Sequence, residues 1–133
     1  MSKQVLWKKQ PAGADYEAAL NFLSLVFPAT RAAGLVRGLR RRRTIERTAK
    51  DLLRASGLPL LPEEESHVSA DLKRIEKRKP LSPILLVQGD LDKAVALTVA
   101  DGYHRVCAVC HFDEDAPVAC RLVPLGNEGR GTG

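Results

Sequence analysis

The residues with the clearest capacity for chemistry lie in one run, Asp101-Gly102-Tyr103-His104-Arg105-Val106-Cys107-Ala108. The apolar segment before it, Val95–Ala100, predicts a strand, and Val106–Phe112, which has no Pro or Gly, predicts a helix. Gly102 would then lie at a strand-to-helix turn, where backbone N–H groups point outward at the positive end of the helix dipole. A turn of this kind is suited to binding phosphate or another anion.

Two cationic side chains follow this glycine. His104 and Arg105 fall in the first turn of the predicted helix, where positive charge opposes the dipole, and a bound anion would account for them. The sequence therefore predicts that Gly102, Tyr103, His104 and Arg105 hold phosphate groups. The alternative is that Arg105 is a surface residue and that His104 stabilises the turn through a side-chain hydrogen bond.

The order of segments around this run resembles the ParB/sulfiredoxin superfamily. A strand over Pro83–Val87, a turn at Gly89-Asp90, a second strand, the motif, a helix and a last strand over Val118–Val123 are expected in that order. ParB-type domains carry Gly-x-x-Arg-x-x-Ala at the motif, and sulfiredoxins carry Gly-Cys-His-Arg. The residues that match are Gly102, His104, Arg105 and Ala108, and the resemblance covers residues 58–124.

The resemblance implies a site for the phosphates of CTP or ATP with Mg²⁺. It also implies a short helix above the phosphates, here expected with an N-cap at Ser69, and a short strand opening the domain near Leu58–Pro62. The residues of that stretch alone predict either an extended linker or a first strand at an edge. His67, Lys73 and Arg74 would then be further phosphate ligands, although for each of them a solvated helix face is the simpler alternative.

One departure from the superfamily bears on catalysis. Sulfiredoxins use a catalytic Cys directly before the His-Arg pair, and this chain has Tyr103 there. A phenol does not replace a thiolate nucleophile, and Cys107 lies one helical turn further on. Sulfiredoxin chemistry is therefore not expected. The candidate catalytic residue is His104, alone or together with Asp101, for a nucleotide hydrolase, a phosphotransferase or a nuclease.

Length and composition favour a cytoplasmic protein of one moderate domain, or a small domain with an added helical segment. The 133 residues are 44% hydrophobic, with no apolar run near the ~20 residues of a membrane span. The polar, basic N-terminus does not resemble a secretory signal, and three Cys fit reduced thiols better than disulfides.

Charge divides the chain near Gly57. Residues 1–57 contain 12 Lys/Arg and 4 Asp/Glu, whereas residues 58–133 contain 9 and 12. We therefore expect a basic helical segment over 1–57, a ParB/sulfiredoxin-like domain over 58–125 and a disordered, Gly-rich tail over 126–133.

Three apolar stripes at helical spacing mark the first segment. The first, with Phe22 and Leu23, follows an N-cap at Asp15 and ends at Pro28; the second runs through Leu35; the third begins at Ile45. The residues before Gly13 are expected to form a flexible arm, which Trp7 could anchor. The first stripe packs in the core or forms a homodimer interface.

Basic residues concentrate between Arg31 and Arg54, where nine Lys/Arg accompany two acids. Because guanidinium groups match phosphate oxygens, this segment predicts contact with nucleic acid, DNA in particular. The alternative is a solvated basic face. The candidate residues are Arg37, Arg40, Arg41, Arg42, Arg43, Arg47 and Lys50.

Two cysteine patterns have the spacing of cofactor sites. Cys107-x-x-Cys110-His111 matches the c-type haem attachment pattern, which requires export and is not expected here. Cys107, Cys110, His111 and Cys120 could form a structural zinc site, although thiols are also common core residues. The sequence shows no carboxylate cluster with metal-binding spacing, and it predicts no metal ligands.

Together these features predict an α+β fold with a helical N-terminal segment and a small mixed sheet. The leading functional prediction is a ParB-like, nucleotide-responsive protein that binds or associates with DNA. The alternatives are a superfamily enzyme that uses His104, and a non-catalytic, dimeric interaction module.

Overall fold

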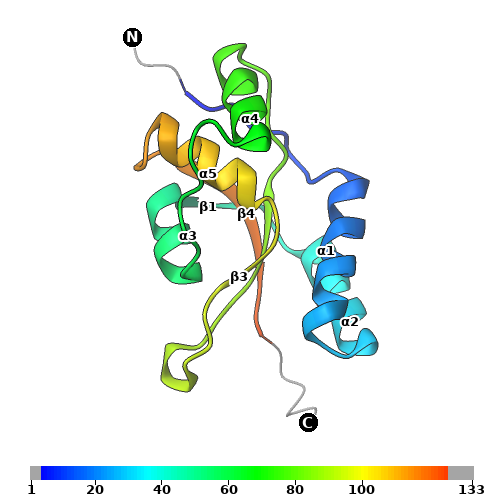
Figure 1. The fold of residues 1–133 in the computed structure, drawn as a ribbon. Coiled ribbons are helices and arrows are strands. Elements are labelled where there is room, and N and C mark those ends of the chain that lie inside the picture. The colour runs from blue at the N-terminus through cyan, green and yellow to red at the C-terminus, as the bar shows by residue number, and fades with distance from the viewer. Residues whose placement is uncertain (1–3, 126–133) are drawn as a thin grey trace.

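The computed structural model describes residues 4–125 as five α-helices and a four-stranded sheet (Figure 1). The predicted α+β class, with helices at the N-terminus and a mixed sheet, is confirmed. The predicted tail, 126–133, lies outside the described residues. The elements are α1 (Gly13–Val26), α2 (Ala29–Arg41), β1 (Ile45–Thr48), α3 (Ala49–Ser56), α4 (Ser66–Glu76), β2 (Ile84–Val87), the 3₁₀ turn η1 (Leu91–Lys93), β3 (Thr98–Asp101), α5 (Tyr103–Phe112) and β4 (Pro117–Val123).

The strands are ordered β1-β4-β2-β3. β4 runs antiparallel to β1 and parallel to β2, and β2 runs antiparallel to β3. All four residues of β2 are buried, as expected for a central strand covered on both faces. The connection between β2 and β3 contains η1, close to the predicted loop at Gly89-Asp90.

Helices cover both faces of the sheet, as Figure 1 shows. Ile84 and Leu86 of β2 pack in one core with α3, α4 and α5. Leu85 and Val87 point to the opposite face and pack with α1 and α2. This alternation follows from the period of two in a strand and explains why β2 is apolar throughout.

The first predicted helix forms, but it begins earlier than expected. Ala12 is the N-cap of α1, and Asp15 lies in the first turn, where its carboxylate accepts the Ala12 N–H at 3.0 Å. A carboxylate at this position is favourable to the helix dipole. The predicted N-cap at Asp15 is therefore wrong, although the side chain does serve the same helix end.

The third predicted helical stripe is wrong at its start. Ile45–Thr48 forms edge strand β1, with Ile45 opposite Cys120 of β4. The helix begins afterwards at Ala49, where the Thr48 hydroxyl accepts the Asp51 N–H at 3.4 Å. Strands from both sides of the predicted boundary at Gly57, β1 before it and β4 after it, therefore belong to one sheet.

Residues 4–12, the described part of the arm before α1, are hydrogen-bonded to the rest of the fold, contrary to the prediction of a flexible lead-in. The Lys8 N–H donates to the Leu81 carbonyl, and the Leu81 N–H donates to the Leu6 carbonyl, each at 2.8 Å. Trp7 packs against the core that contains α5, so its predicted anchoring role is confirmed.

The segment before α4 follows one of its two predicted alternatives. Residues 58–62 form a linker and not a strand, since Pro59 and Pro62 cannot donate to a ladder. α4 begins at Ser66 rather than after Ser69, because the Glu65 carboxylate accepts the N–H groups of His67 and Val68. The earlier start places His67 in the first turn of α4.

A buried arginine supports the end of α2. Arg121 of β4 donates to the Leu39 and Arg40 carbonyls and to the Tyr16 hydroxyl. Those carbonyls lie in the last turn of α2, where a cation is favourable to the helix dipole. Arg121 therefore joins both N-terminal helices to the sheet.

None of the helices in residues 4–125 has the length and apolar character of a membrane span.

Candidate functional site at the start of α5

The strand-to-helix turn forms as predicted, and glycine is required there. Gly102 has φ 109° and precedes α5, whose first turn contains His104 and Arg105. A Cβ on Gly102 would lie 2.5 Å from Cδ1 of Ile84. No side chain among the described residues caps this helix start, so its N–H groups remain available.

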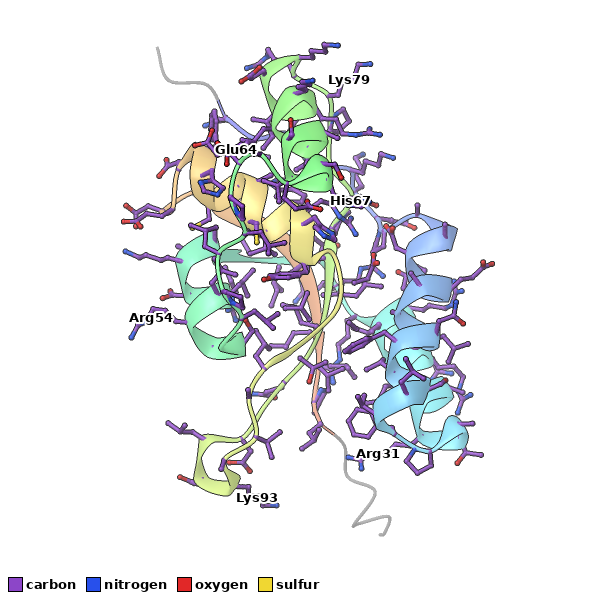
Figure 2. The ribbon with its side chains drawn as sticks, in the orientation of Figure 1. Arg31, Arg54, Glu64, His67, Lys79 and Lys93 are labelled. Carbon is purple, nitrogen blue, oxygen red and sulfur yellow. The ribbon has the colours of Figure 1, made fainter. Side chains whose placement is uncertain are left out.

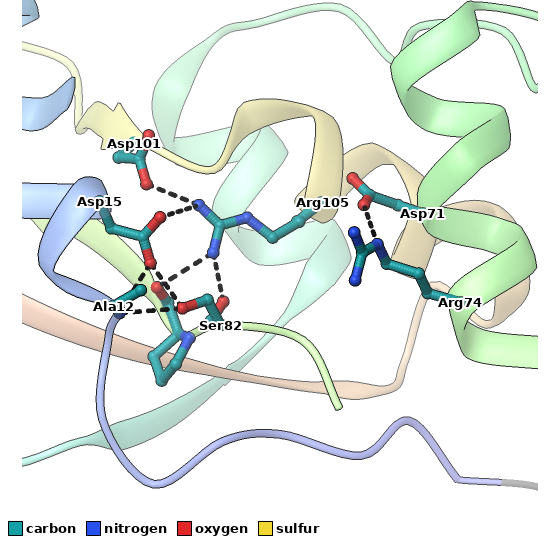
Figure 3. Close-up of polar contacts among 8 residues, drawn as sticks. Ala12, Asp15, Asp71, Arg74, Ser82, Asp101 and Arg105 are labelled. Atoms are coloured by element: carbon teal, nitrogen blue, oxygen red, sulfur yellow. Dashed lines mark hydrogen bonds and ion pairs between the residues drawn. The ribbon is translucent and has the colours of Figure 1, made fainter. Parts of the chain in front are cut away.

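Arg105 is held by the protein itself (Figure 3). Its guanidinium donates to the Asp101 carboxylate and to the Ser82 carbonyl, each at 2.6 Å, and lies 3.7 Å from Asp15. Only 14% of its side chain is exposed. The positive charge that the sequence pattern assigned to a bound anion is thus balanced by two carboxylates.

These contacts connect α1 to the sheet and to α5. Asp15 accepts hydrogen bonds from the Ser82 hydroxyl and from the Ala12 N–H. The pKa of Asp101 is raised to about 6, chiefly by burial; Arg105 opposes this effect, and the Asp15 carboxylate adds to it. The cluster around Arg105 is therefore a structural junction between segments that are distant in the sequence.

A cavity of about 300 Å³ opens between α4 and the start of α5. A neighbouring cavity of about 280 Å³ also contacts Asp71, Arg74 and Arg105. Burial raises the pKa of Asp71, against the lowering effect of Arg105. In the first cavity, α4 contributes His67, Ala70, Asp71 and Arg74, and the α5 side contributes Asp101, Gly102, His104 and Arg105.

The structure brings some, but not all, of the predicted phosphate ligands to this cavity. Tyr103 and Lys73 do not line the cavity. The Tyr103 hydroxyl donates to the Pro59 carbonyl at 2.5 Å, so it fixes the linker before α4. Lys73 is exposed elsewhere on α4. The predicted ligands that do line the cavity are His67, Arg74, Gly102, His104 and Arg105.

Both histidines of the cavity meet one carboxylate. His67 Nδ1 lies 3.1 Å from Glu65 Oε2, and His104 Nε2 lies 3.9 Å from Glu65 Oε1. The two imidazole rings are in contact, with centroids 4.6 Å apart. Figure 2 shows His67 at the end of α4 that lies beside the start of α5.

Comparison of the chain with protein-family models, curated proteins and solved structures finds no match. The ParB/sulfiredoxin resemblance therefore rests on the motif and the order of segments, and stays a prediction.

The seven candidate nucleic-acid residues are all exposed, from the end of α2 through β1 to the start of α3. Three of them have intramolecular partners: Arg40 lies over the Tyr16 ring at 4.2 Å, Lys50 pairs with Asp115 at 2.6 Å, and Arg47 donates to the Glu46 carbonyl at 2.7 Å. The remaining members are Arg37, Arg41, Arg42 and Arg43.

The cysteine set does not assemble as a metal site. Among residues 4–125, the group of at least three His, Cys or acidic donors close enough to share an ion is Glu65, His67 and His104. Cys107 is buried, and burial raises its pKa, as it raises that of Cys120 to about 11. His111 Nε2 is hydrogen-bonded to the Leu61 carbonyl at 2.6 Å. Cys107 thus supplies no exposed thiolate beside Tyr103.

The sequence patterns did not reveal the acidic members of this region. Asp15 fits a helix cap, Glu65 fits an acidic patch, and Asp71 belongs to no motif. The spacing of Asp101 and Arg105, four residues apart across the turn, is a usable signal for their ion pair. No sequence signal predicts the contact between Glu65 and His104, because 38 residues lie between them in the chain.

Proposed function

We propose that the cleft between α4 and α5 binds the phosphate groups of a nucleotide, CTP or ATP, in a ParB-like, nucleotide-responsive protein. The observation that carries this proposal is the uncapped start of α5 at Gly102, which borders a cavity whose opposite wall holds His67 and Arg74. Backbone N–H groups and cationic side chains that converge on one cavity are suited to phosphate. The volume of about 300 Å³ is at the low end for ligand pockets, so the base would lie near the surface.

Arg74 is the cation best placed to take a phosphate. Its Nε lies 4.0 Å from Asp71, at the limit of an ion pair, and 58% of its side chain is exposed. It can therefore turn toward a ligand at little cost. Arg105, in contrast, is bound to Asp101 and Ser82, and its contribution is to hold the α5 start in place.

Mg²⁺ prefers oxygen ligands and is usually bound through substrate phosphates and one or two carboxylates. Asp71 lines the cavity and offers such a carboxylate, whereas Asp101 is engaged by Arg105. Asp71 would therefore hold Mg²⁺ together with the phosphates.

A titration with CTP and with ATP, each with and without Mg²⁺, tests the proposal on wild type, Arg74→Gln and Lys73→Gln. Lys73 is the matched control, because it is the adjacent cation on α4 and does not line the cavity. We expect saturable binding that Arg74→Gln weakens about tenfold or more and Lys73→Gln leaves unchanged. No binding by wild type, or equal loss in both variants, would overturn the proposal.

Turnover is a separate question for the same site. His104 faces Glu65 and is 41% exposed, so it could accept a proton from water in the cavity. Phosphate release that His104→Ala abolishes while binding persists would support an enzyme; binding without release would favour a nucleotide-dependent switch.

A second candidate function, contact with DNA, is favoured by the exposed basic residues of α2, β1 and α3. Replacing Arg41, Arg42 and Arg43 with Ser should weaken DNA binding and reduce the slope of log K against log salt by about 0.9 for each phosphate that the protein no longer neutralises. Lys77→Ser with Lys79→Ser, in an exposed basic stretch after α4, is the control. If wild type binds no DNA, or if both variants lose affinity equally, this function is wrong.

A further inference from the structure

The geometry points to a metal site that the sequence did not indicate: Glu65, His67 and His104 form a three-ligand centre for a divalent transition metal, Zn²⁺ in the first place. Glu65 and His67 lie at the start of α4, and His104 lies in the first turn of α5. The inference does not depend on nucleotide binding, because the three ligands belong to the chain itself.

The distances suit one ion. One donor atom from each residue can be chosen so that all three lie within 4.8 Å of one another. His67 Nδ1 lies 3.1 Å from Glu65 Oε2, and His104 Nε2 lies 3.9 Å from the other carboxylate oxygen, Oε1. In a tetrahedral shell with bonds of about 2.0–2.1 Å, neighbouring donors are roughly 3.3–3.4 Å apart. Small side-chain rotations of the two partly exposed imidazoles would therefore bring the three donors to these separations, with the fourth position open.

The carboxylate of Glu65 is held in position by the backbone. Its Oε1 accepts the N–H groups of His67 at 2.8 Å and Val68 at 2.9 Å, and its Oε2 lies 3.1 Å from His67 Nδ1, the second proposed ligand atom. Partners of this kind commonly orient a metal ligand.

The donor set selects the class of metal. Two imidazoles and one carboxylate suit Zn²⁺, Co²⁺, Ni²⁺ or Cu²⁺, whereas Mg²⁺ and Ca²⁺ prefer oxygen alone. Three protein ligands also leave a coordination position open, as in catalytic zinc sites. His67 and His104 line the cavity of Arg74 and Gly102, so water or an anion there could occupy that position.

An ordinary hydrogen-bonded cluster is the competing explanation, because Glu65 also caps α4. The Glu65→Gln variant distinguishes a metal site from a hydrogen-bonded cap. The amide oxygen of the glutamine can still accept the capping N–H groups, but it carries no charge for a metal. Glu64→Gln is the matched control, because Glu64 is the adjacent acid and is exposed.

The test is a titration of the untagged full chain with Zn²⁺ by calorimetry and with Co²⁺ by absorption. The variants are Glu65→Gln, His67→Ala and His104→Ala, with Glu64→Gln and Cys110→Ser as controls; thermal melting verifies that each variant is folded. Cys110 is included because it is the partly exposed thiol.

We expect one Zn²⁺ per chain, weakened about tenfold or more by each of the three ligand variants and unchanged in both controls. The Co²⁺ spectrum should show d–d bands without thiolate charge-transfer bands. The inference is overturned if wild type shows no saturable binding, if the His variants bind as wild type does, or if Cys110→Ser abolishes binding.

Discussion

The Arg105 guanidinium lies 2.6 Å from the Asp101 carboxylate, and this pair closes the turn between β3 and α5. Arg105 reaches Ser82 from the same position and lies near Asp15 of α1 (Figure 3). The sequence pattern predicted that Arg105 binds phosphate, and in the structure its guanidinium contacts three separate parts of the fold.

Arg105→Ala should destabilise the protein by about 3–5 kcal/mol, because two partly buried carboxylates would lose their cation. Arg105→Lys should recover only part of this, since an ammonium lacks the fork that serves a carboxylate and a carbonyl together. Urea unfolding at neutral pH measures both changes. Arg74→Ala, on the exposed face of α4, is the control and should shift the free energy of unfolding by less than about 1 kcal/mol. Equal effects of the two alanine variants would refute this role for Arg105.

Gly102→Ala should cost about 1–3 kcal/mol, because the residue has φ 109° and its new Cβ would meet the Ile84 side chain. Gly13→Ala is the control, since a Cβ there meets nothing within 4 Å. Thermal unfolding of both variants checks the prediction. A Gly102→Ala protein as stable as Gly13→Ala would show that the turn tolerates a side chain.

The raised pKa of Asp101 predicts a pH dependence of stability. Between the ordinary value of 3.8 and about 6, the folded state keeps a proton that the unfolded state has lost. The contribution of Asp101 to the free energy of unfolding therefore falls as pH rises through this window, by at most about 3 kcal/mol, and is constant above it. Subtracting the unfolding free energy of Asp101→Asn from that of wild type, at several pH values, isolates this contribution. A difference that stays flat or rises with pH would contradict the prediction.

The predicted homodimer through the N-terminal helices has a specific surface available. Phe22, Leu25 and Val26 of α1 are 41%, 84% and 55% exposed, whereas Leu23 is buried in the core of its own chain. If α1 forms the interface, Leu25→Glu should shift sedimentation from dimer to monomer without loss of helix content. A wild-type monomer at all concentrations would exclude this dimer.

Local patterns in the sequence were sufficient for several elements. The strand expected over Pro83–Val87 forms as β2, and Pro28, expected to end the first helical stripe, separates α1 from α2. Helix ends, backbone conformation and the alternation of buried residues depend on neighbours along the chain. A short segment therefore contains the information that predicts them.

Edge strand β1 could not be predicted in the same way. Ile45 fits a helical stripe with Leu52 equally well. What decides that it forms a strand is its pairing with Cys120 of β4, 75 positions later in the chain. Propensity is a weak guide when a strand is four residues long and its partner is distant.

The sequence by itself determined the fold class, the glycine turn and the presence of His104 and Arg105 in the first turn of α5. Only the tertiary structure decided that Arg105 faces inward to Asp15 and Ser82 while His104 faces His67 and Glu65. The physical reason is that electrostatic partners are chosen by distance in space: α1 and α4 bring their carboxylates to opposite sides of the same turn, and no spacing along the chain records this.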